Sequence, residues 1–246
     1  MTASRTASAT RRENASDLPA AGAAAFRSRF LGLTDPVERL ILTPLGFFLS
    51  RLTKARQLHS IWPSGLVGSV PIVQSPQGRP IVDAIFCLPA GCQVVFLGIG
   101  GALRPPAATG QWVCVDRAWN GRREYLRSLD PPADLGRVTA ATAGSLTESW
   151  LSTHALAHRA DVVDMETSHV YEVARRRGIR ALSLLLVSDE PPAQPFWETD
   201  LGRLAPQVGP VMELLGPWLA GNSMGGTPFG GTNTEGGEDA SAHALR

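Results

Sequence analysis

Three carboxylates follow two apolar stretches, and they are the residues whose types and spacing point to chemistry. Asp164 and Glu166 come directly after an apolar pair at 162–163, and Asp189 ends an apolar stretch over 181–187. Because the carboxyl ends of strands in an open α/β sheet form its usual ligand site, we expect these acids to lie close together. An acid at the end of a buried strand is costly unless it is hydrogen-bonded or active, so Asp189 is the strongest single candidate.

The composition is that of an ordinary globular protein. The chain has 246 residues, 43% of them hydrophobic, and a formal net charge of +1. Nothing in this balance indicates a nucleic-acid or membrane partner, and no apolar run reaches the roughly eighteen residues of a membrane span. The cysteines Cys87, Cys92 and Cys114 are odd in number and lack the spacing of a metal site, so we expect free thiols, no bound metal and a cytoplasmic location.

The chain divides into a folded unit and two tails. Residues 1–29 are rich in Ala, Ser, Thr and Arg without an apolar period, and residues 221–246 are rich in Gly, Ser, Thr and Asn. Such segments cannot bury enough apolar surface to fold, so we expect both to be disordered. Residues 30–220 are long enough for one domain with a sizeable core.

The elements that must position the acids alternate along this domain. We expect strands over 40–43, 67–74, 93–99, 111–115, 136–143, 162–164 and 181–187. We expect helices over 79–88, 146–158, 165–177 and 208–219. This alternation predicts a single-domain α/β fold, a mostly parallel twisted sheet with helices on both faces.

Local signals refine several of these boundaries. Ser145 with Glu148 three residues later predicts a capped helix start, and Gly178 predicts a helix end. Pro71 predicts an edge or a bulge in its strand. The glycine-rich run over 98–102 is expected to form a loop after its strand.

The motifs around the acids resemble the purine/uridine nucleoside phosphorylase and nucleosidase superfamily. The resemblance is carried by Val162-Val163-Asp164-Met165-Glu166-Thr167, by Val187-Ser188-Asp189-Glu190, and by the glycine-rich turn with its Leu-x-Pro in 95–105. It spans residues 38–219, with the better match in the second half. It implies a nucleoside phosphorylase-like fold.

The resemblance also implies a role for each matching residue. Glu166 would accept hydrogen bonds from the ribose 2′- and 3′-hydroxyls, Met165 would pack against the sugar, and Asp189 would protonate the departing base. Ser188 would position the loop of Asp189, and Gly98, Gly100 and Gly101 would shape the floor of the site. The chemistry agrees, because cleavage of an N-glycosidic bond builds positive charge on the sugar and negative charge on the base.

The expected phosphate site departs from the family pattern. Phosphorylases of the family hold phosphate with a Gly-Asp-Pro turn, an Arg downstream of it, and an Arg-x-Gly-Thr turn. Here Gly46 and Arg51 stand without the Asp-Pro, while Phe96 and Ile99 replace the Arg and the Thr of the second turn. Arg79, at an expected helix start, is a further candidate anion ligand.

The resemblance therefore implies a nucleoside-cleaving enzyme of purine or related metabolism, phosphorolytic by family, with inorganic phosphate as co-substrate and no other cofactor. The departures leave two alternatives open: a hydrolytic nucleosidase, and a non-catalytic relative that binds a nucleoside or acts as a scaffold. The expected partner is a small nucleoside-like molecule. By analogy with the family, a homo-oligomer is also expected.

Overall fold

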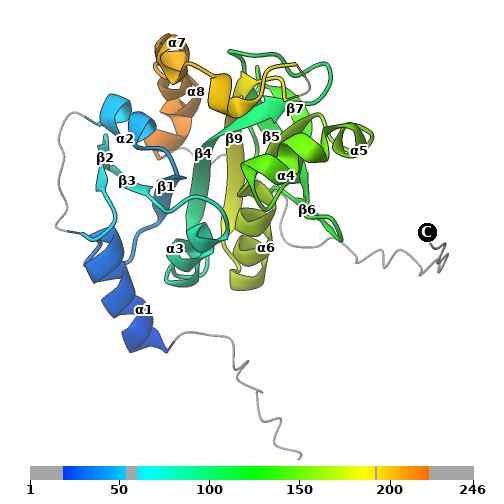
Figure 1. Ribbon diagram of the computed structural model, residues 1–246. Helices are drawn as coiled ribbons and strands as arrows, with labels where there is room; N and C mark the ends of the chain where they lie inside the picture. The colour runs from blue at the N-terminus through cyan, green and yellow to red at the C-terminus, as the bar shows by residue number, and fades with distance from the viewer. Residues whose placement is uncertain (1–18, 54–59, 192, 222–246) are drawn as a thin grey trace, which may run out of the picture.

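The computed structural model of the chain describes residues 19–53, 60–191 and 193–221 (Figure 1). The strands of this part are β1 (Arg39–Thr43), β2 (Ser64–Val67), β3 (Val70–Gln74), β4 (Gln93–Ala102), β5 (Trp112–Trp119), β6 (Glu124–Leu126), β7 (Gly136–Thr142), β8 (Val162–Asp164) and β9 (Arg180–Asp189). Its α-helices are α1 (Ala20–Phe26), α2 (Gly46–Leu52), α3 (Val82–Phe86), α4 (Leu146–Leu151), α5 (Thr153–Ala157), α6 (Thr167–Arg177), α7 (Leu201–Leu204) and α8 (Pro210–Leu219). Short irregular turns are η1 (Arg27–Leu31), η2 (Arg79–Ile81), η3 (Phe196–Glu198) and η4 (Ala205–Gln207).

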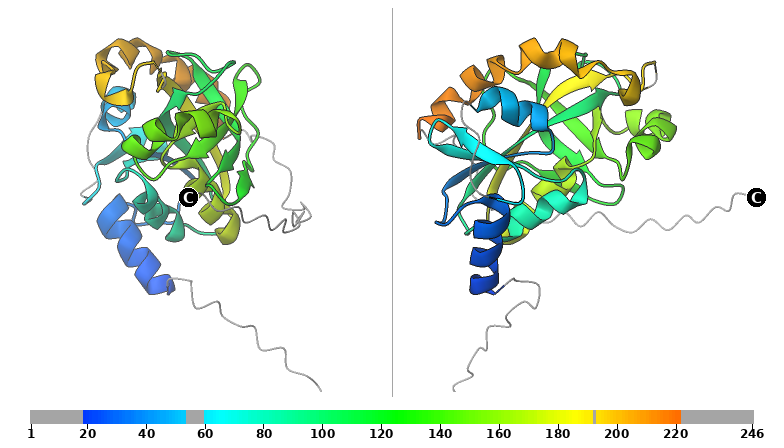
Figure 2. Two further views of the ribbon diagram at one scale, coloured as in Figure 1. Left: turned by 45° about the vertical axis from the view of Figure 1, so that its right-hand side comes forward. Right: turned by 60° about the vertical axis from the view of Figure 1, so that its left-hand side comes forward.

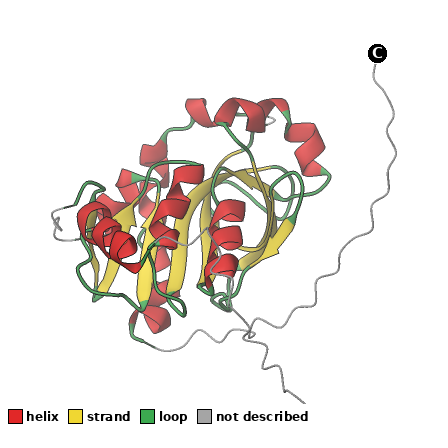
Figure 3. Cartoon of the chain, turned by 90° about the horizontal axis from the view of Figure 1, so that it is seen from below, coloured by secondary structure: helices red, strands yellow, loops and turns green. Residues whose placement is uncertain are grey.

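All of these strands belong to one mixed sheet. Strands β3, β1, β4 and β9 run parallel to one another in that order, and β5, β7 and β8 form a second parallel group. Antiparallel pairing of β9 with β5 and of β8 with β4 joins the two groups, so that β4, β9, β5, β7 and β8 close a ring. Figure 3 shows that the sheet curls on itself where these strands close the ring. The predicted α/β fold class is confirmed, with a sheet that is mixed rather than purely parallel.

Helices cover both faces of the sheet, as predicted. Neighbouring residues of a strand point to opposite faces. Phe96 accordingly packs in the core cluster that contains residues of α3 and α6, whereas Leu97 packs in the cluster that contains residues of α2 and α8. Both faces of β4 and β9 are therefore buried, which explains their nearly continuous apolar sequence.

Several boundaries differ from the sequence-based prediction. The strand expected over 67–74 is a hairpin, because Gly68 takes a φ of 61° and lets the chain turn between β2 and β3. Pro71 consequently lies in an interior strand, opposite Leu66 of the edge strand β2. The helix expected over 146–158 is divided into α4 and α5, although Ser145 caps its start by accepting a hydrogen bond from the Glu148 backbone N at 3.1 Å.

Part of the predicted N-terminal tail is helical and packs against the domain. Helix α1 and the first part of η1 lie within the segment 1–29 that the composition assigned to a tail, and α1 projects from the body of the protein (Figure 2). Phe26 and Phe30 stack at 4.3 Å and both meet Trp62 edge-on, which fastens this segment to the domain. The predictions for 1–18 and 222–246 lie outside the described residues.

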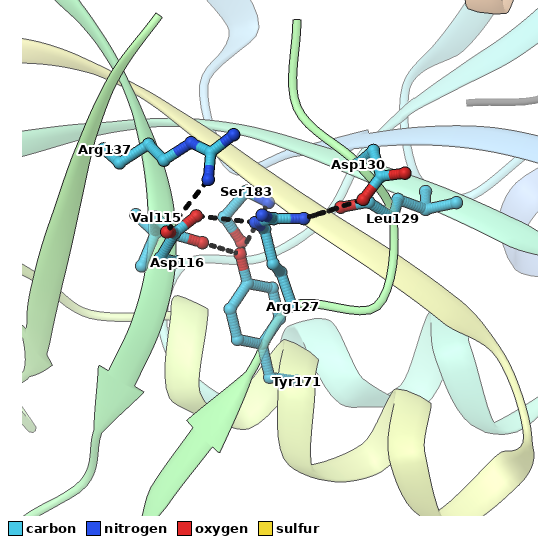
Figure 4. A network of polar contacts seen from close by, with 8 residues as sticks. All are labelled: Val115, Asp116, Arg127, Leu129, Asp130, Arg137, Tyr171 and Ser183. Atoms are coloured by element: carbon cyan, nitrogen blue, oxygen red, sulfur yellow. Dashed lines mark hydrogen bonds and ion pairs between the residues drawn. The ribbon is translucent and has the colours of Figure 1, made fainter. Parts of the chain in front are cut away.

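A buried tyrosine on α6 joins two strands where they separate. The pairing of β5 with β9 ends at Val115 and Ser183. There the Tyr171 hydroxyl donates to the Val115 carbonyl at 2.6 Å and accepts from the Ser183 backbone N at 2.9 Å (Figure 4). Beside it Arg127 is held by Asp116 at 2.6 Å. Tyr171 thus ties α6, which follows Glu166, to the strand that ends at Asp189.

We expect Tyr171→Phe to lower the free energy of unfolding by about 1–3 kcal/mol, because it leaves the Val115 carbonyl and the Ser183 N–H buried without a partner. Urea denaturation followed by circular dichroism measures this difference. The matched control is Tyr125→Phe, since the chain has two tyrosines and the Tyr125 hydroxyl has only a 3.4 Å contact from Asn120. Equal losses for both variants would contradict the assigned role of Tyr171.

Candidate active site

The predicted acids meet in one pocket at the carboxyl ends of β4, β8 and β9. Its lining residues are Pro44, Leu45, Gln77, Ile99, Gly100, Gly101, Leu146, Ser149, Val163, Asp164, Met165, Glu166, Ser188, Asp189, Pro191 and Phe196. The hollow measures about 560 Å³ when its open mouth and the adjoining solvent are included. Strands from both parallel groups of the sheet supply the acids.

Asp164 is held by hydrogen bonds on both carboxylate oxygens. Its Oδ1 accepts from the Thr142 hydroxyl at 2.9 Å, and its Oδ2 accepts from the Thr167 backbone N at 2.8 Å and from the Thr167 hydroxyl. Burial nevertheless raises the pKa of Asp164. With its oxygens occupied in this way, Asp164 fixes the turn between β8 and α6.

Glu166 lies on that turn, immediately before α6. We predicted a helix that begins at Met165, but the observed helix begins at Thr167. The N–H group of Thr167 donates to the Asp164 carboxylate, which holds the preceding residues in a turn. The Glu166 Oε1 accepts a hydrogen bond from the Gly78 backbone N at 2.6 Å. Burial, followed by the nearby charge of Asp164, raises the pKa of Glu166 to about 7.

Asp189 ends β9 and is 4% exposed. Burial raises the pKa of Asp189 to about 6, opposed by a short hydrogen bond from the Ser188 hydroxyl to Oδ1. An acid whose pKa lies within about one unit of neutrality is partly protonated there and can give its proton to a leaving group, as a general acid requires. The geometry thus supplies two buried acids, Glu166 and Asp189, on different walls of one pocket.

The glycines of β4 have different roles. The predicted loop over 98–102 is instead the end of β4, because its backbone pairs with both β8 and β9. Gly100 and Gly101 line the pocket, and a Cβ on Gly101 would lie 2.5 Å from Pro191 Cγ and 3.1 Å from Asp189 Oδ2. Gly98 is not among the lining residues; a Cβ there would lie 2.7 Å from the Phe96 ring, so its glycine serves packing.

None of the three candidate phosphate ligands lines the pocket. Gly46 begins α2 beside the Gln74 side chain, and Arg51 is exposed near the end of the same helix. Arg79 is exposed in η2 and close enough to His169 to help lower the pKa of that imidazole, after burial as the main cause. Among the described lining residues there are three carboxylates and no arginine, lysine or histidine.

Apolar side chains surround the mouth of the pocket. Leu146 of α4 and Phe196 of η3 line it, and next to them Trp150 and Trp197 meet edge-on at 6.0 Å. These two tryptophans are about half exposed. The rim therefore offers aromatic surface to an incoming ligand rather than charge.

Comparison with known proteins shows which proteins this chain resembles. Residues 147–200, the segment that contains both Glu166 and Asp189, match the family model of the phosphorylase superfamily. A comparison with curated proteins gave no match. The solved structures that resemble the chain include the 5′-methylthioadenosine/S-adenosyl homocysteine nucleosidase of Campylobacter jejuni, which is 13% identical with a TM-score of 0.57 and covers 72% of this chain and 96% of its own.

Two further solved structures extend the comparison. The AMP nucleosidase of Bacteroides thetaiotaomicron is 17% identical, with a TM-score of 0.57 over 79% of this chain and 97% of its own. The purine nucleoside phosphorylase of Toxoplasma gondii is 16% identical, with a TM-score of 0.57 over 76% and 92%. The chain has the phosphorylase-superfamily fold. The resemblance inferred from the sequence is thereby confirmed.

Within this phosphorylase-superfamily fold, the sequence missed three residues that hold the acids. Thr142 contacts Asp164 from 22 residues away, and Gly78 contacts Glu166 from 88 residues away. No local sequence pattern predicts contacts between such distant residues. Thr167 left a signal, because an Asp three residues before a helical residue is a common helix-start arrangement. The described residues hold no cluster of three metal-ligating side chains, and no helix among them is long and apolar enough to cross a membrane.

The raised pKa of Glu166 predicts how stability depends on pH. A carboxyl group that binds its proton more tightly when folded stabilises the protein fully below its unfolded pKa of 4.5, and this stabilisation is lost as the pH rises through about 7. We therefore expect Glu166→Gln to raise the free energy of unfolding at pH 8 by up to about 3 kcal/mol, and to change it little at pH 5. Urea denaturation at both pH values measures this. Identical pH dependence of the wild type and the variant would contradict the assignment.

Proposed function

We propose that this chain cleaves the N-glycosidic bond of a nucleoside-like metabolite and that water is the acceptor. The observation that carries the proposal is the meeting of Glu166 and Asp189 in one apolar-rimmed pocket of the phosphorylase-superfamily fold. The roles implied by the family motifs fit this placement. The proteins with the same fold include nucleosidases and a phosphorylase.

In the proposed reaction, Asp189 gives its proton to the base nitrogen as the C–N bond breaks and the bonding electrons pass to the base. Positive charge develops on the sugar, where the ionised Glu166 accepts hydrogen bonds from the 2′- and 3′-hydroxyls. The oxygen of a water molecule then forms a bond to the anomeric carbon, and a proton of that water passes to the Asp189 carboxylate, which restores the acid. Each residue thus favours the transition state over the substrate.

The charge of the pocket favours water over phosphate as the acceptor. A phosphate dianion would enter a site whose described lining carries three carboxylates and no cation. Burial weakens the screening of such repulsion, so the free energy of bringing phosphate in would be unfavourable. Phosphorolysis, which the family resemblance implied, would need Arg51, Arg79 or a second copy of the chain to supply the missing cation.

The test is release of free base from a panel of nucleosides, with and without inorganic phosphate, followed by chromatography. Hydrolysis predicts equal rates in both buffers and free sugar as the second product, with ¹⁸O from labelled water in the sugar. Release that depends on phosphate and yields sugar 1-phosphate would overturn the choice of water. Absence of release from every nucleoside, together with binding of one of them by calorimetry, would favour the non-catalytic alternative.

The homo-oligomer expected by analogy is a separate proposal. Light scattering coupled to size-exclusion chromatography measures the molar mass in solution. A dimer or larger assembly supports it, and a monomer at micromolar concentration contradicts it.

A further inference from the structure

Gln77 carries a side-chain donor of the pocket that the protein leaves unused. Apart from the acids, the described lining side chains with N–H or O–H groups are Gln77, Ser149 and Ser188. The Ser149 hydroxyl donates its single proton to the Leu146 carbonyl at 2.7 Å, and the Ser188 hydroxyl donates to Asp189. The Gln77 amide has no hydrogen-bond partner within the described ranges, so its two N–H groups and its carbonyl oxygen are available to a ligand.

Gln77 belongs to the same part of the pocket as Glu166. The backbone N of the next residue, Gly78, donates to Glu166 Oε1 at 2.6 Å. The segment that carries Gln77 follows β3, and in the sheet β1 and β4 lie between β3 and β9, the strand that ends at Asp189. Gln77 therefore lies at the end of the pocket that holds the sugar in the proposed reaction.

A ribonucleoside has one sugar hydroxyl that Glu166 does not bind in the proposed reaction. Glu166 takes the 2′- and 3′-hydroxyls, and the 5′-hydroxyl remains. The 5′-oxygen is attached through C4′, across the ring from the carbon that is bonded to the base. With the base at Asp189, this hydroxyl points to the other end of the pocket. The Gln77 amide both donates and accepts, as a hydroxyl group does, so the two groups match.

The charge around Gln77 sets a second condition on the ligand. A 5′-phosphate at this end would lie near the carboxylates of Glu166 and Asp164, and the described lining supplies no cation to balance it. Repulsion between like charges is screened only weakly where burial excludes water and salt. Arg79 is close in sequence, but it is exposed and is not a lining residue. The site therefore favours a neutral group at the 5′ position.

We propose that Gln77 is a specificity-determining residue that binds the 5′-hydroxyl of the substrate, and that the substrate is a neutral nucleoside rather than a nucleoside 5′-phosphate. The proposal rests on the proposed function and deepens it by naming the substrate class. The 5′-hydroxyl keeps its charge and position while the C–N bond breaks. The contact with Gln77 is therefore equally strong in the substrate complex and the transition state, and it lowers KM without changing kcat.

The first test compares ligands with and without the 5′-hydroxyl. Calorimetry measures the dissociation constants of adenosine, uridine and their 5′-deoxy analogues in an Asp189→Asn background, where Asn has the charge of the protonated acid and turnover is slow. We expect Gln77→Leu to weaken the binding of the nucleosides about five- to tenfold, the usual effect of one hydrogen bond, and that of the 5′-deoxy analogues less than about twofold. Equal losses on both kinds of ligand, or no binding of either nucleoside, would overturn the proposal.

The matched control is Gln207→Leu. Gln207 is an exposed glutamine of η4 and is not among the lining residues. This variant should bind every ligand as the background protein does. A loss confined to the nucleosides in this control would show that a distant glutamine has the same effect, and would overturn the assignment of Gln77.

The second test changes the charge at position 77. In the same background, AMP and UMP should bind at least about tenfold more weakly than adenosine and uridine. Gln77→Arg should strengthen the binding of both monophosphates about tenfold, and Gln77→Leu should not, because only a cation offsets the repulsion. Monophosphates that bind as tightly as the nucleosides, or weak binding that Gln77→Arg leaves unchanged, would overturn the proposal.

Kinetics separate this proposal from the proposed function. With Asp189 in place, Gln77→Leu should raise KM for nucleosides about five- to tenfold and leave kcat within about twofold of the wild type. A loss in kcat alone would overturn the role of Gln77 and leave the proposed function intact. If the wild type releases no base while calorimetry shows the expected pattern, the proposed function fails and the recognition of the 5′-hydroxyl stands.

Discussion

We expect Asp189→Asn to lower kcat for base release by a factor of about 10²–10⁴, the usual contribution of a general acid. Asn has nearly the same shape but no proton to give. Burial raises the pKa of the wild-type acid to about 6, so a fraction of the protein still carries this proton near neutral pH. Steady-state base release on the best nucleoside of the panel measures the loss.

The matched control is Glu190→Gln, which changes the next carboxylate along the chain. Glu190 is exposed and is not among the residues that line the pocket. Its rate should stay within a factor of about two of the wild type, as for a surface substitution far from such features. Substantial base release by Asp189→Asn would remove Asp189 as the acid and leave leaving-group activation to another group.

We expect Glu166→Gln to lower kcat/KM for ribonucleosides by a factor of about 10²–10³, comparable to the loss of one preorganised electrostatic contact. In the proposed reaction the carboxylate both accepts hydrogen bonds from the sugar hydroxyls and faces the positive charge that develops on the sugar. Because the reaction needs Glu166 ionised and Asp189 protonated, and their pKa values lie at about 7 and about 6, we also expect wild-type activity to pass through a maximum between pH 6 and pH 7 and to fall on both sides of it. Kinetics over pH 5–9 measure both effects.

Sugar analogues separate the two contributions of Glu166. A 2′,3′-dideoxynucleoside lacks the hydroxyls, so the part of the loss due to hydrogen bonding should disappear with this substrate. The control variant is Glu172→Gln, which removes a carboxylate of α6 whose side chain is 33% exposed and should change kcat/KM little. An identical loss on ribo- and dideoxynucleosides would contradict the assignment of Glu166 to the sugar hydroxyls.

The acids were the most predictable part of the site. Asp164, Glu166 and Asp189 could be placed together because apolar strands that end in acids follow a general rule of α/β sheets. Ser188, Met165, Gly100 and Gly101 were predicted as neighbours through the family motifs, and all four line the pocket. These residues are close in sequence to a strand end, so local pattern sufficed.

The anion-binding candidates were the least predictable part. Arg51 and Arg79 have the right chemistry at plausible positions, yet both are exposed and outside the pocket lining. The direction of a long side chain depends on the packing of the helix or turn that carries it, and neither position has a strong local signal. The mixed character of the sheet escaped prediction for a similar reason, since β9 pairs with both β4 and β5 through contacts distant in sequence.

The sequence by itself determined the α/β class, the strand ends that carry the acids and the capping residues Ser145 and Gly178, because each depends on neighbouring residues and on the period of the apolar pattern. Only the tertiary structure decided that Gly78 binds Glu166, that the Ser188 hydroxyl binds Oδ1 of Asp189, and that the described pocket lining contains no cation. These features arise where segments far apart in the chain meet. Their geometry depends on tertiary packing, which the local sequence pattern does not predict.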